Sequence, residues 1–397
     1  MKLKLLTALT ILILLLTACD SSNDSIPPPI NEESESGEAL GSTEAPIYTE
    51  LGIPLAQKYP GGDLARCVWD MAIHEGGIFL GSGDYDKNRG PVEIWRYDIA
   101  GNVFTQSGTV PDEEVNRFSF IFDTLVAPGI DPKEEWDWGN FYAYEGGEWV
   151  KHRTLPGGVH CFDIVEYSGM IFAGLGVEDG AGYSPIVYAF DINDPFKPLS
   201  LYKDGAPRDT AGYEYIRVYD FFLVGEDLYA LLYLYDSEGQ LPHAYELYRY
   251  GYDEDAFFFE DDWKEMFARI KYKYIHIGEK VLFDGSLFFT TGYLYETSDM
   301  KTVTQLPFSA STLVCDLYVG DDTLYILTSA KDTESGKIKT TVYELKAGTR
   351  ELCEVFSFLY DVPSMSMVVD GKNFYIGMGS RSSHEKNGML LRVSLPT

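Results

Sequence analysis

The chain has 397 residues, 45% of them hydrophobic and 15% aromatic, and a formal net charge of −31 at pH 7. A balance this acidic repels nucleic acid and anionic lipid head groups, so it excludes nucleic acid as an expected partner and favours solubility or cationic partners. We expect the four cysteines beyond residue 19 to be small buried thiols rather than a disulfide framework: Cys67, Cys161, Cys315 and Cys353.

The N-terminus has the features of a secretory signal. A short basic segment, residues 1–4, precedes an apolar run, residues 5–16, that is too short to cross a bilayer as a permanent helix. The run closes with Leu16-Thr17-Ala18-Cys19, which resembles the lipobox of bacterial lipoproteins. The resemblance implies cleavage before Cys19, a lipid anchor on its sulfur and a place at the extracytoplasmic face of the cell membrane. A plain signal peptide is the alternative.

A polar segment, residues 20–46, separates the signal from the rest of the chain. It has no aromatic residue, is rich in Ser, Pro, Glu and Asn, and carries seven acids with no base. Such a segment buries too little apolar surface to fold. We therefore predict a signal peptide (1–18), a lipidated disordered tether (19–46) and a folded body (47–397). The body retains a charge of −26, since the tether contributes −7 and the signal peptide +2.

A repeat fills the body. An aspartate followed eight residues later by an aliphatic–aromatic pair occurs four times, at Asp70, Asp163, Asp220 and Asp316. Degenerate copies begin at Arg117, Glu279 and Ser366. Repeats of roughly 40–60 residues made only of strand-like segments are typical of a β-propeller. The sequence predicts an all-β fold, a seven-bladed β-propeller of four-stranded antiparallel blades, with six blades as the alternative because the second and fifth units match least well.

The third unit shows four strands most clearly, over residues 160–167, 170–175, 185–190 and 196–202. The last unit runs out of chain in its third strand, residues 390–395. Upstream of the first unit, the strand-like segment 52–59 has no unit of its own. We expect this segment to supply the missing outer strand, so that no long sheet edge is left unpaired.

Loops before the first strands and between the second and third strands open on one face of a propeller, around the channel mouth. Arg, His, Asp and Trp side chains there would bind a carboxylate-bearing sugar through bidentate arginine contacts and stacking. The candidate ligand-binding residues are Arg66, Trp69, Asp70, Arg117, Trp136, Trp138, His160, Asp163, Arg217, Asp220, His276 and Arg381. For the recurring aspartates we favour a structural role, in which they bond backbone amides.

Asp84, Asp86 and Asn88 have the spacing that opens a calcium-binding loop, in which alternate oxygens converge on the cation. The loop lacks the sixth-position glycine, and Trp95 stands where a bidentate acid would close the site. We therefore favour a polar turn between two strands over a Ca²⁺ site, and expect no cofactor.

Neither a Gly-x-Ser-x-Gly elbow nor a His-Glu-x-x-His, Cys-x-x-Cys or phosphate-loop motif occurs in the chain. The sequence therefore favours a lipid-anchored binding or scaffold protein that recognises glycan or protein at the channel mouth. The alternative is a polysaccharide lyase or glycosidase on the same face, because propeller enzymes draw single residues from several blades.

Overall fold

The computed structural model describes residues 48–133, 138–178, 183–191, 197–208, 215–235, 244–261, 263–272 and 277–396. Residues Glu44–Thr397 form one compact unit. The expected signal peptide and tether, with Cys19, as well as Trp136 and His276, lie outside the described residues. Within those residues, no helix has the length and apolar character needed to cross a membrane.

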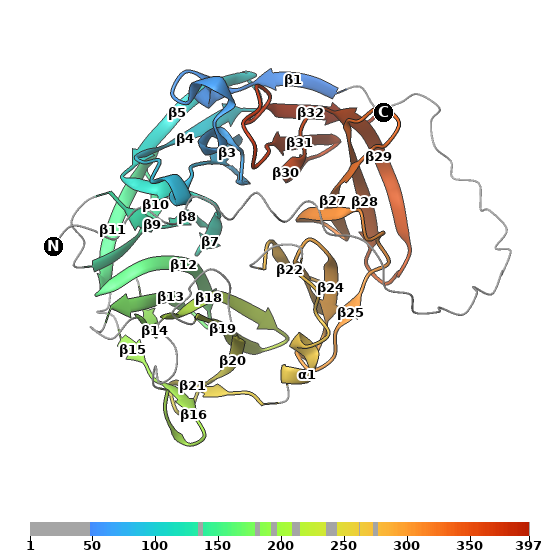
Figure 1. The fold of residues 1–397 in the computed structure, drawn as a ribbon. Coiled ribbons are helices and arrows are strands. Elements are labelled where there is room, and N and C mark those ends of the chain that lie inside the picture. Colours follow the sequence, from blue (N-terminus) through green and yellow to red (C-terminus); the bar gives the residue numbers. More distant parts are fainter. Residues whose placement is uncertain are drawn as a thin grey trace, which may run out of the picture. The chain divides into compact units, whose positions relative to one another are not determined.

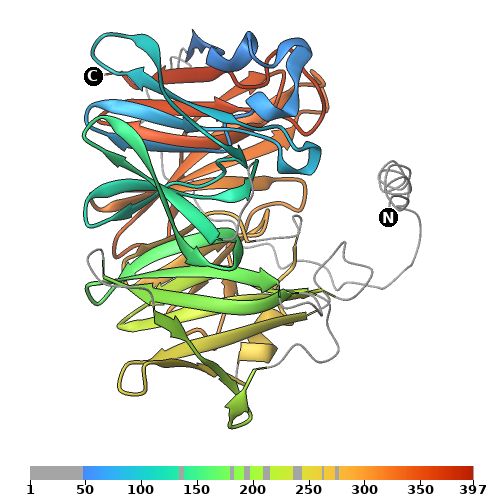
Figure 2. The same ribbon diagram turned by 90° about the vertical axis from the view of Figure 1, so that its left-hand side faces the viewer.

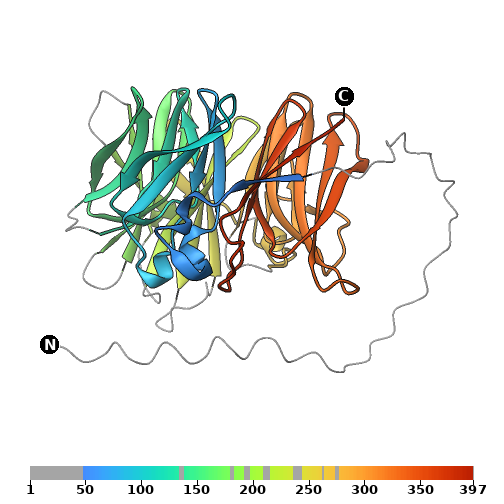
Figure 3. The same cartoon turned by 90° about the horizontal axis from the view of Figure 1, so that it is seen from above.

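Seven four-stranded antiparallel blades surround a central channel, which confirms the all-β, seven-bladed propeller (Figure 1). In each of the first six blades, the first strand in sequence lies innermost and the next three follow outwards. Figures 2 and 3 show the blades from the side, with their faces packed against one another.

The strands of the first four blades are, from the channel outwards, as follows. Blade 1 has β2 (Asp70–His74), β3 (Gly77–Gly81), β4 (Val92–Asp98) and β5 (Val103–Val110). Blade 2 has β7 (Ser119–Ile121), β8 (Thr124–Pro128), β10 (Trp138–Glu145) and β11 (Glu148–Pro156). Blade 3 has β12 (Gly158–Tyr167), β13 (Met170–Glu178), β14 (Tyr183–Phe190) and β15 (Lys197–Leu199). Blade 4 has β18 (Tyr215–Val224), β19 (Asp227–Tyr235), β20 (Ala244–Gly251) and β21 (Ala256–Phe259).

Three further blades complete the ring. Blade 5 has β22 (Lys280–Phe283), β23 (Ser286–Thr290), β24 (Leu294–Thr297) and β25 (Thr304–Gln305). Blade 6 has β26 (Leu313–Gly320), β27 (Thr323–Lys331), β28 (Ile338–Lys346) and β29 (Leu352–Tyr360). Blade 7 has β30 (Ser364–Asp370), β31 (Asn373–Met378), β32 (Leu390–Ser394) and β1 (Tyr48–Gly52). The elements outside the blades include β6 (Asp112–Glu114), β9 (Ile130–Pro132) and the helix α1 (Trp263–Phe267).

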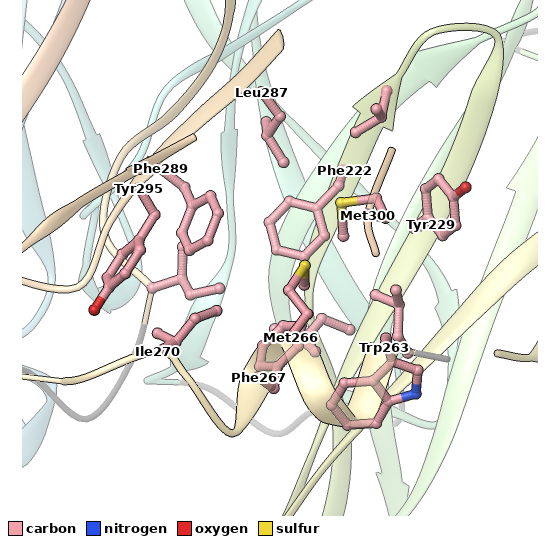
Figure 4. Close-up of a cluster of buried hydrophobic side chains, with 14 of the residues drawn as sticks. Phe222, Tyr229, Trp263, Met266, Phe267, Ile270, Leu287, Phe289, Tyr295 and Met300 are labelled. Atoms are coloured by element: carbon pink, nitrogen blue, oxygen red, sulfur yellow. The ribbon is translucent and has the colours of Figure 1, made fainter. Parts of the chain in front are cut away.

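The cores lie between neighbouring blades, so a middle strand is covered on both faces and reads as a continuous apolar run. Strand β19 shows this, because eight of its nine residues are buried. Where blades 4 and 5 meet, Phe222 of β18 packs with Phe289 and Tyr295 of blade 5, and α1 adds Trp263 and Phe267 (Figure 4). Aromatic residues thus fill the wedge-shaped space between sheets.

The outer part of blade 3 differs from the predicted strand over 196–202. Here β15 pairs with β14, whereas β16 (Leu201–Lys203) pairs in parallel with β21 of the next blade and forms a hairpin with β17 (Ala206–Pro207). The reason is the buried carboxylate of Glu246 on β20, which needs cationic partners. Lys203 on β16 and Arg208 just after β17 both bond to it, with Arg208 Nε at 2.8 Å.

The N-terminal segment does close the ring, but with a different strand from the one predicted. Strand β1 pairs antiparallel with β32, whereas the expected strand over 52–59 is wrong beyond Gly52. Proline lacks the N–H that a sheet needs, and Pro54 and Pro60 each begin a 3-10 turn instead. A third turn, Leu64–Arg66, leads into blade 1.

The four cysteines of the body are free thiols, as expected from the sequence. Cys67 and Cys161 are buried and Cys315 is half-buried. The expectation of burial is wrong for Cys353, which lies on the outermost strand of blade 6 and is exposed.

Candidate functional site

The repeat aspartates form hydrogen bonds between neighbouring blades at the channel. Asp70 accepts hydrogen bonds from the backbone N–H of Met71 in its own strand, at 2.7 Å, and from that of Phe118 in blade 2, at 2.5 Å. The same pair of bonds joins Asp163 to Ile164 and Phe221, and Asp316 to Leu317 and Met367. Three of the four aspartates therefore bond backbone amides, the structural role favoured from the sequence.

A β-bulge before the repeat residue accompanies this arrangement. The strand register shifts between Cys161 and Asp163 in blade 3, and between Val218 and Asp220 in blade 4. The same shift occurs at Asp316 in blade 6 and at Ser366 in blade 7. A bulge leaves one residue out of the ladder and re-aims its neighbours. Asp70 makes the same contact without a register shift, so the bulge mainly re-aims the residue before the repeat position. In blades 3 and 4 that residue lies in the N-terminal half of the inner strand, on the mouth side of the aspartate.

Two cations pair with repeat aspartates at the channel. Both cations come from blades in which the repeat is degenerate. Arg117 stands at the repeat position of blade 2, and its Nη1 lies 3.3 Å from Asp163 Oδ1 and 3.1 Å from Asp220 Oδ1. Lys280 follows the degenerate Glu279 of blade 5, and its Nζ lies 2.5 Å from Asp163 Oδ2 and 2.9 Å from Asp220 Oδ1. We call Arg117, Asp163, Asp220 and Lys280 the axial ion cluster.

The electrostatics of the channel differ between its two sides. Burial alone would raise the pKa of Asp220, but Lys280 and Arg117 hold it below the usual value. On the other side, burial raises the pKa of Asp70 and of Asp316 well above the usual value, and the carboxylate of Glu279 adds to both shifts. The channel therefore has a charge-paired side and an acidic side.

Aromatic rings gather at the mouth above the axial ion cluster. The rings of His160 and Phe162 stack with centroids 5.2 Å apart, and Phe162 stacks on Tyr219 at 4.0 Å. The guanidinium carbon of Arg217 lies 5.8 Å from the centre of the Phe162 ring. The Tyr235 hydroxyl donates a hydrogen bond to that of Tyr219 at 3.2 Å. We call these five residues the mouth array.

Local backbone features position the array. Phe162 and Tyr219 are the residues that the two β-bulges leave out of the ladder. Gly176 on β13 makes room for Arg217, because a Cβ at position 176 would lie 2.9 Å from the arginine Cγ. Burial and the nearby Arg217 lower the pKa of His160 to about 3, so its imidazole is neutral at pH 7.

A loop of blade 1 approaches the array from another side. Tyr85 in this loop is 41% exposed, and its hydroxyl interacts electrostatically with Tyr219 and Arg217. The loop is held by Glu114 on β6, whose Oε2 accepts a hydrogen bond from the Tyr85 backbone N–H at 3.3 Å. Burial raises the pKa of Glu114 to about 7, and the acids Asp84 and Asp86 contribute to the shift.

The other candidate residues lie in separate elements, outside the mouth array. Arg66 is buried and donates to the backbone oxygens of His384 and Glu385, so it ties the N-terminal segment to blade 7. Trp69 is half-buried and donates from Nε1 to the Gly83 oxygen at 2.8 Å. Trp138 is 41% exposed at the start of β10. Arg381 is exposed in the loop between β31 and β32.

Sequence reasoning identified His160 and Arg217 but missed Phe162, Tyr219 and Tyr235. A usable signal was present, because Phe162 and Tyr219 each immediately precede a repeat aspartate. The position before the aspartate is the bulged one, and two aromatic residues at equivalent positions of adjacent blades could have been expected to meet. Nothing comparable marks Tyr235, whose position depends on the pairing of β18 with β19.

The loop with the calcium-like spacing forms a short turn, and lysine side chains bond to its oxygens. Asp84 caps the 3-10 turn Tyr85–Lys87, and its Oδ2 lies 3.1 Å from Lys87 Nζ. The backbone and side-chain oxygens of Asn88 accept hydrogen bonds from Lys133 Nζ, at 3.2 and 3.1 Å. In the part of the chain that the structure describes, no group of three or more His, Cys, Asp or Glu side chains is arranged to hold a metal ion.

No protein-family model and no curated protein sequence matches the chain. Solved structures match its fold at low identity. A chain of a mitotic checkpoint complex is 8% identical with a TM-score of 0.47, and the match covers 94% of this chain and 99% of that one. Puromycin hydrolase is 12% identical with a TM-score of 0.48, covering 79% of this chain and 50% of the other. The Dos1 propeller is 9% identical with a TM-score of 0.45, covering 82% and 78%. Likenesses this distant carry no argument about function.

Removal of one cation should unbalance the axial ion cluster. Lys280→Met leaves the buried carboxylates of Asp163 and Asp220 with Arg117 alone, so we expect the free energy of unfolding to fall by about 3–5 kcal/mol. The depressed pKa of Asp220 adds stability above its unfolded value of 3.8, which is lost as pH falls through the lower folded pKa. Without Lys280 the folded pKa of Asp220 should be higher, so the variant should lose this stability at a higher pH than the wild type. Urea denaturation between pH 3 and 7 measures both effects.

The exposed Lys372→Met is the control for that experiment and should unfold like the wild type. Adding Asp220→Asn to Lys280→Met should restore part of the lost stability, because it removes one of the unpaired charges. An unfolding midpoint of Lys280→Met equal to that of Lys372→Met would contradict the role of the cluster.

Glu114 should give the protein a pH dependence of opposite sign. A folded pKa of about 7 against 4.5 unfolded means that the folded state binds the proton more tightly. The free energy of unfolding should therefore fall as pH rises from 4.5 to 7, by at most about 3 kcal/mol from this group. Glu114→Gln should lack this contribution, whereas the exposed Glu148→Gln should keep it. Equal pH slopes for all three proteins in urea denaturation would refute the assignment.

Proposed function

We propose that this protein is a lipid-anchored, extracytoplasmic binding module that recognises a carboxylate-bearing glycan at the mouth array. The observation that carries the proposal is the convergence of Arg217, a stack of aromatic rings and tyrosine hydroxyls at one place on the mouth face. A guanidinium group can bind a carboxylate with two parallel hydrogen bonds. Phenol groups present an apolar ring and a polar tip, which suits the mixed surface of a sugar.

The state of His160 supports a ligand with hydroxyl groups. Its ring is neutral at pH 7, and its buried Nδ1 has no hydrogen-bond partner among the described residues. A neutral imidazole can both donate and accept a hydrogen bond. The half-buried Arg217 and Tyr219 lie beside it, with the more exposed Tyr85 of blade 1 nearby. These groups offer a sugar a set of donors and acceptors around an aromatic base.

The bonding of the repeat acids favours recognition over cleavage. An enzyme on this face would need a free acid and a second carboxylate as nucleophile or base. Asp70 and Asp163 each accept two backbone hydrogen bonds, and Asp163 also pairs with two cations. Their oxygens already serve the contacts between blades. A lyase or glycosidase built on these aspartates would have to break those contacts.

The negative charge of the folded body does not prevent a carboxylate from binding at Arg217. The folded body is strongly acidic, but charges more than a Debye length of about 8 Å away are largely screened at physiological salt. The carboxylate of the glycan would meet the guanidinium of Arg217 directly. The local contact therefore outweighs the distant charges of the same molecule.

A glycan array tests the site, with full-length protein in detergent applied to uronate-containing and neutral glycans. We expect binding to uronate-containing glycans, at least a tenfold loss in Arg217→Ala because the carboxylate loses its cation, and a smaller loss in Tyr219→Phe, which keeps the ring and removes the hydroxyl. The matched control is Arg249→Ala, because Arg249 lies toward the opposite end of blade 4 in surface ion pairs with Asp227 and Glu260.

Three results would count against this function. Unchanged binding in Arg217→Ala would place the ligand elsewhere. Release of glycan fragments would assign the protein to the enzyme alternative. Binding to none of the glycans on the glycan array would exclude those glycans and leave a protein partner as the ligand.

The anchor rests on the resemblance of Leu16-Thr17-Ala18-Cys19 to a lipobox, followed by a polar segment suited to be a tether. Metabolic labelling with a radioactive fatty acid in a bacterial host tests it. We expect label in the wild type and none in Cys19→Ser, since serine offers no thiol for the lipid. Cys353→Ser, which removes an exposed thiol of the body, is the control and should be labelled like the wild type. Equal label in wild type and Cys19→Ser would refute the anchor.

A further inference from the structure

The channel holds a cavity of about 310 Å³, separate from the mouth array. Its walls come from the innermost strands of blades 1, 2, 5, 6 and 7, beyond the repeat residues and so away from the mouth. Most of the residues along these walls are apolar: Met71, Ala72, Ile73, Phe118, Phe120, Val281, Leu317, Val319, Met367 and Val368. Phe120 and Val319 are 49% and 38% exposed, so the apolar wall is in contact with solvent.

Three carboxyl groups, those of Asp70, Glu279 and Asp316, also line this cavity. They lie close enough to repel one another electrostatically. Among the described residues none of the three makes an ion pair, whereas the cations Arg117 and Lys280 pair with the two aspartates on the other side of the channel. The cavity thus combines apolar residues with three carboxyl groups that repel one another, and Arg117 offsets part of the charge of Asp70 and Glu279.

We infer that this cavity binds an organic cation, a molecule with an ammonium head group and an aromatic or alkyl body. The ammonium would lie against the three carboxyl groups, and the body would cover the apolar wall near Phe118 and Phe120. The cavity volume falls within the roughly 300–1,000 Å³ of small-molecule sites. The strong negative charge of the folded body would also draw a cation toward the channel.

The chemistry of the walls selects this class of ligand over others. An anion would meet the three acids and be repelled. A hydrated metal ion would leave the apolar wall uncovered, and the described residues hold no cluster of metal-ligating side chains. A neutral apolar molecule would leave the mutual repulsion of the three carboxyl groups unrelieved, whereas a cation would relieve it. A cation with an apolar body satisfies both parts of the surface.

Isothermal titration calorimetry of the full-length protein in detergent tests the inference with three isosteric probes: 2-phenylethylammonium, 2-phenylethanol and phenylacetate. We expect the ammonium to bind at millimolar concentration or below, the neutral alcohol at least about tenfold more weakly, and the anion not at all. Glu279→Gln should weaken ammonium binding at least about tenfold. Glu148→Gln, an exposed acid on β11 of blade 2, is the matched control and should bind like the wild type.

Glu279 is half-buried and its side chain accepts no hydrogen bond among the described residues, so its variant should fold, which a circular dichroism melt verifies. If Glu279→Gln does not fold, Phe120→Ala replaces it as the test variant. The exposed Phe120 ring lines the cavity, so its loss should weaken the binding of the ammonium and of the alcohol alike. Absence of ammonium binding, equal affinity for the alcohol, or wild-type affinity in the folded channel variant would each overturn the inference. Arg217→Ala should leave ammonium binding unchanged, which separates this cavity from the mouth array.

Discussion

The geometry of the channel rests on one contact that recurs at three of the seven blade junctions in the described residues, in which an aspartate of an inner strand bonds the backbone amide of the next blade. Asp70, Asp163 and Asp316 each make it, and each also bonds the amide that follows it in its own strand. Each aspartate thus ties its own strand to the next blade, and the directionality of its hydrogen bonds fixes how the two strands face each other. These bonds hold the inner strands at a common level, from which the channel and its mouth take their geometry.

The places where the repeat is broken shape the candidate sites. Blade 2 carries Arg117 in place of the aspartate, and blade 5 carries Glu279 followed by Lys280. The two cations pair with Asp163 and Asp220, whereas the acids of blades 1, 5 and 6 make no ion pair among the described residues. The same channel therefore has a neutralised side below the mouth array and an acidic side that lines an apolar-walled cavity. Departures from the repeat are more informative about ligands than the repeat itself.

The number of blades and the structural role of the aspartates could be predicted from the sequence, because both follow from local patterns that recur. The closing strand was predicted in the wrong place, although Pro54 and Pro60 argue locally against a strand over 52–59. Its partner could not be predicted, because the pairing with β32 joins the two ends of the folded body. The exchange of β16 into the neighbouring sheet was missed for a similar reason, since it follows from the buried Glu246 on another blade.

The class of fold, its repeat and the residues suited to ligand chemistry follow from the amino-acid sequence, because strand periodicity and turn residues act over a few neighbours along the chain. Which of those residues meet depends on the packing of the blades. It committed Arg66 to the ring closure and Arg117 to an ion cluster, and it brought Arg217 of blade 4 to Phe162 of blade 3. Contacts between blades join residues some 50 positions apart, and a bulge of one residue decides which side chain makes them.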